Sequence, residues 1–422
     1  MIPEKAFDRL LGLDERWEIV AAEYEAEPTG RFVLIARETD RLWPTLSCRC
    51  GSKDIVCHDH AELRTWRHLD AFGKRTDIQC AGPRARCRKC LQVWRVRVPW
   101  EGEGKHFTRD FEAFALTLIR EMPMKKAGEI LGEHDTRLWR MVFAHVDKAY
   151  GALDLSEVTQ LGVDELSARK GHDYLTVFAD LVKRRVVFAT EGKDHTTFER
   201  FAEEILKHNG HPQAIQAIAM DLSRAYQKGA REEWPNAQIV FDPFHVTALV
   251  SRAVDEVRRR EAASGAEAKE ALQKTLYLFR KNPENLTEAE QGRLEELDLK
   301  HLATGQAYLI RLELRDIYEH TVKPERVRYR LESWVNWVRS KCERFGECLA
   351  PMKKAADTIE KHLEGILAHW TSGWLSTGFL EGLNSVFSAV KRKARGFRSS
   401  VYMIAMLYFV AGKLPMPSLI RH

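Results

Sequence analysis

Long apolar runs are absent from the 422-residue sequence. No stretch reaches the roughly 18 apolar residues that a membrane-spanning helix requires, so none is predicted. The first residues include acidic side chains and lack the apolar centre of a secretory signal peptide, which favours a bacterial-type cytosol as the expected location. The apolar fraction of 44% is ordinary for a globular protein, and the length allows two to four domains.

Cysteine is scarce outside one short segment, because six of the eight cysteines fall between residues 48 and 90. Without a secretory signal, such clustering favours metal binding over disulfides. A C-x₂-C pair and a less regular C-x-C pair predict a zinc ribbon. The preferred ligands are Cys48, Cys50, Cys87 and Cys90. The alternates are Cys57, His58, His60 and Cys80, although Cys57 and Cys80 are also explained as small buried residues.

Positive charge is concentrated in the same segment. Residues 48–100 contain 12 Lys and Arg against 5 Asp and Glu, a local net of +7, whereas the whole chain carries +5. A basic module on a nearly neutral body indicates a nucleic-acid contact surface, and a solvated basic face is the alternative.

The segment that follows has the apolar spacing of helices. Residues 109–120 predict one helix, residues 124–131 a second and residues 135–150 a third, with Gly132 between the last two. This order is typical of a helix-turn-helix, although a plain helical hairpin has the same pattern. The third helix would present Thr136, Arg137 and Arg140 to the major groove of DNA.

Residues 158–260 alternate between strand-like and helix-like runs. Three closely spaced strands are followed by two strands that alternate with helices, an order that predicts an α/β, RNase H-like fold. The predicted strands are 158–163, 174–181, 185–189, 214–220 and 238–241. The next 110–130 residues are nearly free of strand patterns and predict an all-α insertion, whose tryptophans are interpreted as core.

Three carboxylates lie at distinctive places in this pattern. Asp164 interrupts the first strand, Asp221 ends the fourth, and Glu381 lies on a later helix. A carboxylate beside a buried strand is costly unless it is paired or bound to a metal, and three of them could hold two Mg²⁺ ions. The simpler alternatives are a turn acid, a helix cap and an exposed helical glutamate.

Further polar residues lie near this predicted site. Asp242 and His245 follow the fifth strand and are possible auxiliary residues; Asp242 is also placed to cap the helix that begins at Pro243. Asn384 lies on the same helix face as Glu381, at position i+3. A basic stretch then predicts contacts with the DNA backbone through Lys391, Arg392, Lys393, Arg395 and Arg398.

Four stretches together resemble the ISL3 family of bacterial insertion-sequence DDE transposases. They are residues 161–172, 220–226, 239–246 and 377–384, the last together with 391–398. The resemblance implies that Asp164, Asp221 and Glu381 bind catalytic Mg²⁺ or Mn²⁺. It also implies that the zinc ribbon and the helix-turn-helix bind the terminal inverted repeats of the element and that the protein acts as a homodimer. The expected location is the bacterial cytoplasm, in association with the nucleoid. The family shows C-P-x-C-G at the first knuckle, so Cys48 is displaced by one position here.

The resulting domain prediction has six parts. They are an N-terminal extension (1–45), a zinc ribbon (46–104), a helix-turn-helix domain (105–155), the first part of the catalytic core (156–260), a helical insertion (261–372) and the second part of the core (373–422). The predicted activity is metal-dependent DNA cleavage and strand transfer. The alternatives are a non-catalytic DNA-binding regulator and a structure-selective nuclease on the same fold.

Overall fold

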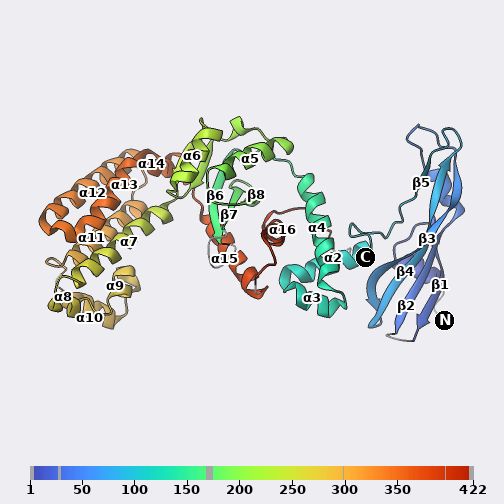
Figure 1. The fold of residues 1–422 in the computed structure, drawn as a ribbon, viewed down its shortest axis with the longest axis horizontal. Helices are drawn as coiled ribbons and strands as arrows, with labels where there is room; N and C mark the ends of the chain where they lie inside the picture. The colour runs from blue at the N-terminus through green and yellow to red at the C-terminus, as the bar shows by residue number, and fades with distance from the viewer. Residues whose placement is uncertain (1–3, 27–29, 168–173, 298, 395, 418–422) are drawn as a thin grey trace. The chain divides into compact units, whose positions relative to one another are not determined.

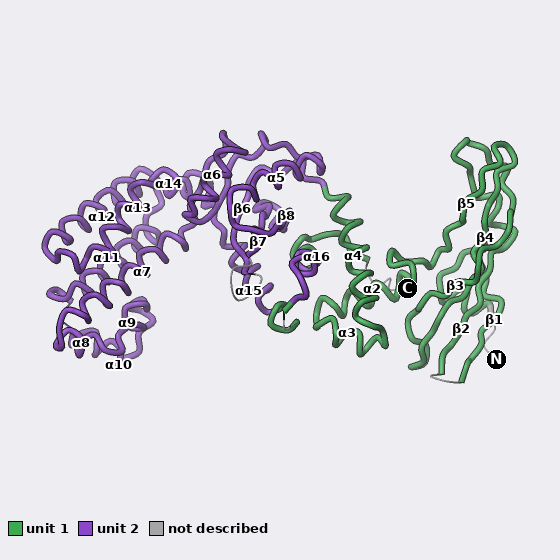
Figure 2. The backbone as a smooth tube through the Cα atoms, in the orientation of Figure 1, with its two compact units in different colours: residues 1–153, 390–396, 408–422 green, residues 154–389, 397–407 purple. Residues whose placement is uncertain are grey.

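The computed structural model describes residues 4–26, 30–167, 174–297, 299–394 and 396–417 (Figure 1). The chain divides into two compact units, shown in Figure 2. The first contains residues 1–153, 390–396 and 408–422, and the second contains residues 154–389 and 397–407. In the described ranges, no helix is both long and apolar enough to cross a membrane.

The first unit begins with a five-stranded sheet. Its strands run in the order β1-β2-β4-β3, and the short β5 also pairs with β4. The long β3–β4 hairpin closes at Phe72 and Gly73, whose φ values of 56° and 71° suit a tight hairpin turn. The elements are α1 (Glu4–Leu10), β1 (Trp17–Glu25), β2 (Arg31–Glu38), η1 (Asp40–Thr45), β3 (Ile55–Ala71), β4 (Lys74–Cys87) and β5 (Val93–Arg95).

Three helices follow the sheet: α2 (Arg109–Glu121), α3 (Met124–Leu131) and α4 (Asp135–Gly151). These bounds agree closely with the helical spacing of the sequence. Helix α3 ends at Gly132, whose φ of 63° is the left-handed conformation that glycine adopts readily at a helix end. The side chain of His134 then caps α4 by accepting a hydrogen bond from the backbone of Thr136.

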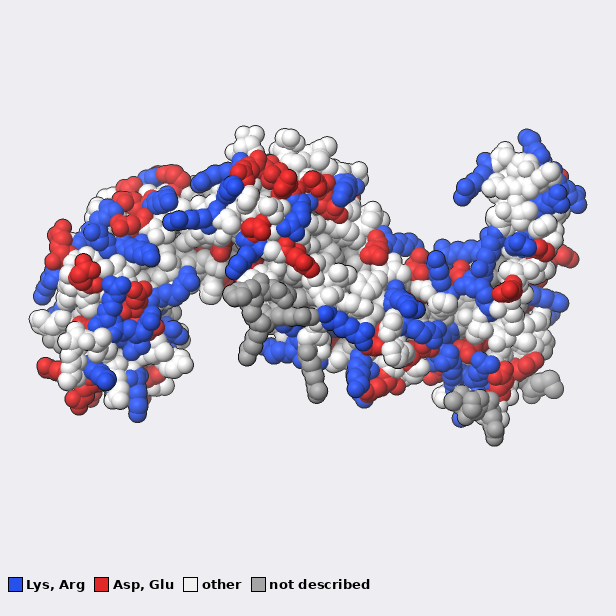
Figure 3. Space-filling model, viewed as in Figure 1, with Lys and Arg blue, Asp and Glu red and all other residues white. Residues whose placement is uncertain are grey.

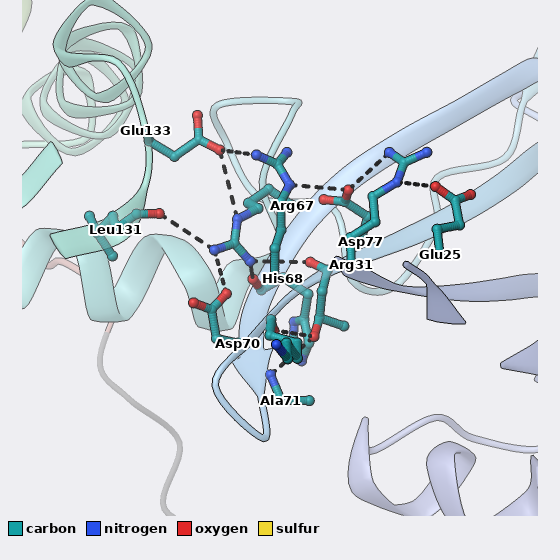
Figure 4. A network of polar contacts seen from close by, with 12 residues as sticks. Glu25, Arg31, Arg67, His68, Asp70, Ala71, Asp77, Leu131 and Glu133 are labelled. Atoms are coloured by element: carbon teal, nitrogen blue, oxygen red, sulfur yellow. Dashed lines mark hydrogen bonds and ion pairs between the residues drawn. The ribbon is translucent and has the colours of Figure 1, made fainter. Parts of the chain in front are cut away.

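A buried network of charged side chains joins the sheet to these helices within the first unit (Figure 4). Arg67 on β3 is only 3% exposed, and its guanidinium lies 3.8 Å from Glu133 and 3.4 Å from the carbonyl of Leu131. Its backbone also pairs with the segment before α2, through His106 and Thr108. The contacts hold the turn between α3 and α4 against the sheet.

The second unit contains another five-stranded sheet, ordered β10-β9-β6-β7-β8. The strands are β6 (Gln160–Ser167), β7 (Tyr174–Asp180), β8 (Arg185–Glu191), β9 (Ala217–Met220) and β10 (Gln238–Phe241). Strands β6, β7 and β8 form antiparallel pairs, whereas β9 runs parallel to both β6 and β10. All five correspond to strand-like runs of the sequence.

Helices pack against the residues of this sheet on two sides. Helix α5 (Thr196–Lys207) and the end of α6 (Arg224–Glu233) contribute aromatic rings that surround Phe178 of β7, namely Phe198, Phe201 and Trp234. Small residues of β9 and β10 pack against α14 (Leu363–Thr371) and the segment after it. Helix α15 (Gly378–Lys393) follows that segment, and α16 (Ser400–Ala411) comes last.

The segment between β10 and α14 has no strand among its described residues. Its long helices are held by buried polar contacts as well as by apolar packing. Glu261, near the end of α7, accepts hydrogen bonds of 2.7 Å from the first backbone N–H groups of α11. Trp334 is buried and donates to the carbonyl of Ile310, which fits its interpretation as core. The elements are α7 (Pro243–Ala262), α8 (Ala266–Ala271), α9 (Leu276–Arg280), α10 (Glu288–Glu296), α11 (Ala303–His320), α12 (Pro324–Phe345) and α13 (Ala350–Lys361).

Candidate active site, metal centre and DNA-binding residues

Three aspartates follow the same row across the parallel strands of the second unit. Gly162 of β6 lies opposite Ala219 of β9, and the same register continued by two residues places Asp164 beside Asp221. Met220 lies opposite Phe241 of β10, so the next residues, Asp221 and Asp242, are also neighbours. Side chains in one row of a parallel sheet share a face. The sheet therefore brings together acids that are 57 and 21 positions apart in the chain.

The Asp164 carboxylate is held on both of its oxygens. Oδ1 accepts a hydrogen bond of 2.7 Å from the backbone of Glu165, and Oδ2 accepts one of 2.7 Å from the side-chain amide of Asn384 on α15. Because Asn384 is three residues beyond Glu381, this bond ties the glutamate helix to the first strand. The sequence predicts that Asn384 lies on the same helix face as Glu381, but it does not show that Asn384 binds Asp164.

Asp221 forms a local turn before α6, and Ser223 caps that helix. Its Oδ1 accepts from the backbone of Ser223 at 2.9 Å, and Ser223 is the residue whose side chain caps α6. The alternative interpretation of Asp221 as the helix cap is therefore wrong.

Asp242 caps α7, as its position before Pro243 predicts. Its Oδ1 accepts from the backbone of Phe244 at 2.8 Å, and its Oδ2 accepts from both the backbone and the hydroxyl of Thr377. Thr377 immediately precedes α15. Asp242 thus connects the start of the Glu381 helix to the start of α7: Oδ2 holds Thr377, and Oδ1 caps α7.

A glycine lets α15 approach the sheet closely. A Cβ at Gly162 would lie 2.7 Å from Leu181 and 3.0 Å from Leu380, closer than such atoms normally approach. Leu380 directly precedes Glu381. The missing side chain at Gly162, two residues before Asp164, therefore helps to set how near Glu381 comes to the sheet.

The carboxyl groups of Asp164 and Glu381 are influenced by neighbouring charged groups of the same region. Burial raises the pKa of the Asp164 carboxyl and Asp221 adds to that shift, while the Glu165 backbone, His245 and Asn384 oppose it. Burial also raises the pKa of Glu381, with Asp242 and Asp164 adding to it and His245 opposing it. Mutual repulsion of buried carboxylates is what a bound cation relieves.

The three carboxylates supply the oxygen ligands that Mg²⁺ prefers. Oε1 of Glu381 is buried and has no hydrogen-bond partner. Among the described residues, two groups bring three or more metal-binding atoms within 4.8 Å of one another, and Asp164, Asp221 and Glu381 belong to neither. Two Mg²⁺ ions lie about 3.5–4 Å apart, each about 2.1 Å from its oxygen ligands, so together they can be held by oxygens as much as roughly 8 Å apart.

One of the two compact groups consists of the four preferred cysteines. Their sulfurs all lie within 4.8 Å of one another, with Cys48 and Cys90 at 3.4 Å and Cys50 and Cys87 at 3.8 Å. Sulfurs bound at about 2.3 Å around a tetrahedral Zn²⁺ are about 3.8 Å apart. All four are free thiols. The irregular spacing of the first pair therefore does not keep Cys48 away from the group.

The alternates lie elsewhere. Cys80 is buried in the sheet core, and burial raises the pKa of its thiol to about 12. This fits the interpretation of Cys80 as a small buried residue. Cys57 and His60 belong to the second compact group, together with Glu38. His58 is in neither group and lies 3.8 Å from Asp59.

Comparison with known proteins decides the family. A DDE transposase model of the ISL3 family matches residues 161–407, and the helix-turn-helix domain of transposase family ISL3 matches residues 96–146. The chain belongs to the ISL3 family of transposases. It is 28% identical to the transposase for insertion sequence element IS1557 of Mycobacterium tuberculosis, over 97% of this chain and 96% of the relative. It is 26% identical to the transposase for element IS1001 of Bordetella parapertussis, over 95% and 97%.

Helix α4 of this transposase carries the predicted groove-reading residues in two different settings. Arg137 is 37% exposed, pairs with Glu133 and lies over the ring of Phe107 at 4.9 Å, so part of its role is structural. Arg140 is exposed, and Thr136 is half-buried at the start of the helix. Of the two arginines, Arg140 is the freer to reach a base edge.

Exposed basic residues also surround the cysteine cluster. In Figure 3, Lys and Arg side chains gather at the end of the sheet that carries β5. The exposed residues beside the four cysteines are Arg49, Lys53, Arg86, Arg88 and Lys89. The local charge of the sequence is therefore displayed on the surface and not only buried in ion pairs.

The basic stretch after Glu381 is described except for Arg395, which lies outside the described residues. Arg392, Lys393 and Arg398 are exposed and Lys391 is half-buried. The Lys393 ammonium donates to the carbonyl of Glu121 at 3.4 Å. Residues 168–173, part of the first family-like stretch, also lie outside the described residues.

Sequence reasoning missed several residues of the site and one basic surface. Thr377 and Gly162 gave no signal of their own, because their roles depend on partners 135 and 218 positions away. A groove in the second unit is also basic, although no motif marks it. It is lined by Arg224, Gln227, Lys228, Arg231, Glu232, Lys361 and His362.

Proposed function

We propose that this ISL3 transposase cuts DNA at the ends of an insertion sequence and joins the freed ends to a target. Asp164, Asp221 and Glu381 would hold two Mg²⁺ or Mn²⁺ ions for this reaction. The observation that carries the proposal is the strand register that sets Asp164 beside Asp221, with Asn384 tying the Glu381 helix to the same row. The strand order and the antiparallel and parallel pairings support an RNase H-like catalytic domain.

The protein residues position the acids and the DNA. Asn384 and the Glu165 backbone restrain Asp164, while Asp242 and Thr377 hold the start of the Glu381 helix. His245 is near enough to Asp164 and Glu381 to influence both carboxyl groups, and from there it could contact the scissile phosphate. Bound Mg²⁺ ions supply activation of the attacking oxygen and stabilisation of the leaving oxygen.

The reaction consists of two successive exchanges at phosphorus. In the first, water attacks a phosphodiester at the element end, a new P–O bond forms, the old one breaks, and a 3′-OH is released. In the second, that 3′-OH attacks a target phosphodiester in line. Each step replaces one P–O bond by another, so no external energy source or covalent protein intermediate is needed.

DNA recognition is assigned to the first unit. We propose that the helix-turn-helix and a zinc ribbon, with Zn²⁺ on Cys48, Cys50, Cys87 and Cys90, bind the terminal inverted repeats. The exposed arginines and lysines around the cysteines would contact phosphates. A homodimer would hold the two ends of the element together.

The test uses purified full-length protein, Mg²⁺ and labelled DNA that carries the element end. Wild type should nick at the end and join the 3′-OH to target DNA. Glu381→Gln and Asp164→Asn should lower both activities by about 100- to 1,000-fold, in line with removal of a group that stabilises developing charge, and should keep end binding. Glu165→Gln is the matched control, since it removes a neighbouring carboxylate from the other face of β6.

The other outcomes separate the alternatives. End binding without nicking by wild type, in Mg²⁺ and in Mn²⁺, would indicate a DNA-binding regulator. Nicking that ignores the end sequence, without joining, would indicate a structure-selective nuclease. Loss of end binding together with cleavage in the acid variants would assign these acids a role in folding.

A further inference from the structure

The second compact group of metal-binding atoms lies on the sheet of the first unit. A carboxylate oxygen of Glu38, the sulfur of Cys57 and a ring nitrogen of His60 all lie within 4.8 Å of one another. His60 Nε2 is 2.6 Å from Glu38 Oε1. No cysteine of the four-cysteine cluster takes part.

The sheet explains why these three side chains meet. Glu38 ends β2, whereas Cys57 and His60 lie on β3, and β4 separates the two strands. The β2–β4 pairing ends at Ile35 opposite Gln79, three residues before Glu38. On its other side β4 pairs Pro83 with His60. Because Pro83, opposite His60, has no long side chain, β4 leaves room for the His60 ring to reach Glu38.

One atom of the group is left unsatisfied by the protein. The Glu38 side chain is only 10% exposed, and its Oε2 is buried without a hydrogen-bond partner. A buried carboxylate oxygen with no partner is costly, so a ligand that pairs with it is strongly favoured. Cys57 and the 47%-exposed His60 form the open side, through which an ion can enter.

We propose that Glu38, Cys57 and His60 form a second site for a transition-metal ion of the zinc class. A thiolate, an imidazole and a carboxylate together select Zn²⁺ or a similar ion over Mg²⁺, which prefers oxygen ligands alone. Three protein ligands leave one tetrahedral position for water. The thiolate and the carboxylate balance the two positive charges, and the ion links β2 to β3 across β4.

The test counts zinc in full-length protein produced with added Zn²⁺, desalted in excess Mg²⁺ and measured by inductively coupled plasma mass spectrometry. Wild type should carry two zinc ions per chain, one at the four cysteines and one at this site. Cys57→Ser and His60→Asn should each carry one. Cys90→Ser should lose the other ion, so the two sites are counted separately.

Matched substitutions control for the loss of a thiol or an imidazole. His58→Asn changes a histidine of the same strand outside the group, and Cys342→Ser changes a half-buried cysteine on α12; both should keep two ions. Asp164→Asn should also keep two, since zinc in the acid site would otherwise be counted. Circular dichroism melts check that each variant is folded.

A single zinc in wild type that Cys90→Ser loses and Cys57→Ser keeps would overturn the proposal. So would a count of two that Cys57→Ser and His60→Asn leave unchanged, because Glu38 and His60 would then form only an ion pair. Equal zinc loss in His58→Asn or Cys342→Ser would also overturn it, since the loss would not be specific to the group. None of these results bears on DNA cleavage, which rests on other residues.

Discussion

At the scale of single residues, the site depends on side chains that act on the acids as well as on the acids themselves. Asn384 restrains Asp164, and Thr377 connects Asp242 to the start of α15. Gly162 contributes by having no side chain. These residues place the carboxylates without binding an ion, so their substitution should affect the rate of cleavage more than folding or end binding.

Gly162→Ala should slow end cleavage about 10-fold, equivalent to about 1.4 kcal/mol in the activation barrier. The added methyl would displace Leu181 and Leu380, whose flexible ends can move, and the shift of Leu380 would draw Glu381 away from the sheet. Single-turnover cleavage measures the rate. Gly382→Ala is the control, because a Cβ at that helical position meets nothing within 4 Å. Equal rates for the two variants would contradict this role of Gly162.

Thr377→Val should also slow cleavage while end binding is kept. The change removes one of the hydrogen bonds to the buried Asp242 carboxylate at a cost of about 1–3 kcal/mol, and the Thr377 backbone bond remains. Thr377→Ser retains the hydroxyl and should restore most of the rate. If serine and valine behave alike, the hydroxyl does not position the helix.

At the scale of structural elements, buried polar contacts fix how helices meet sheets. In the first unit the partners of Arg67 include Glu133 and the carbonyl of Leu131, so the turn before α4 is held by the sheet (Figure 4). A buried ion pair is weak evidence for stability, but removing one partner leaves the other charge buried and unpaired. The network therefore makes the sheet and the three helices depend on each other.

Arg67→Met should lower the free energy of unfolding of the first unit by about 1–3 kcal/mol, because the carbonyl of Leu131 loses its buried donor. Glu133 loses one ion-pair partner but keeps Arg137 and Arg75. Urea denaturation followed by circular dichroism measures the change. Arg84→Met removes an exposed partner of Asp59 on the neighbouring strand and should change the free energy of unfolding much less, because solvent screens an exposed pair. If both variants lose a similar amount of unfolding free energy, burial of the arginine does not determine how much it contributes to stability.

At the scale of the whole molecule, the net charge is small but the charged side chains are unevenly distributed over the surface. The chain carries +5 overall, yet basic residues gather around the cysteine cluster and line a groove in the second unit. Local charge of this kind attracts a DNA backbone and makes binding depend on salt. Other arginines, such as Arg339, are already paired with carboxylates and are less available to bind a phosphate.

Replacing Arg231 and Lys361 together by glutamine should weaken DNA binding and reduce its dependence on salt, since about two fewer phosphate contacts are made. Fluorescence anisotropy over a range of salt concentrations measures both quantities. Arg339→Gln removes an arginine that pairs with Asp357 and Glu360. It should leave the slope of log affinity against log salt concentration unchanged. If this slope is also unchanged in the double variant, the groove does not contact DNA phosphates.

The sequence by itself determined the helices and strands, the positions of Asp164, Asp221 and Glu381, and the four cysteines now found together. Those features depend on local periodicity, caps and short spacings, which a sequence displays directly. The tertiary structure decided that Asp164 aligns with Asp221, that Asp242 accepts hydrogen bonds from Thr377, and that Glu38 contacts His60. These depend on strand register and on contacts between distant segments, which only the packing of the folded chain fixes.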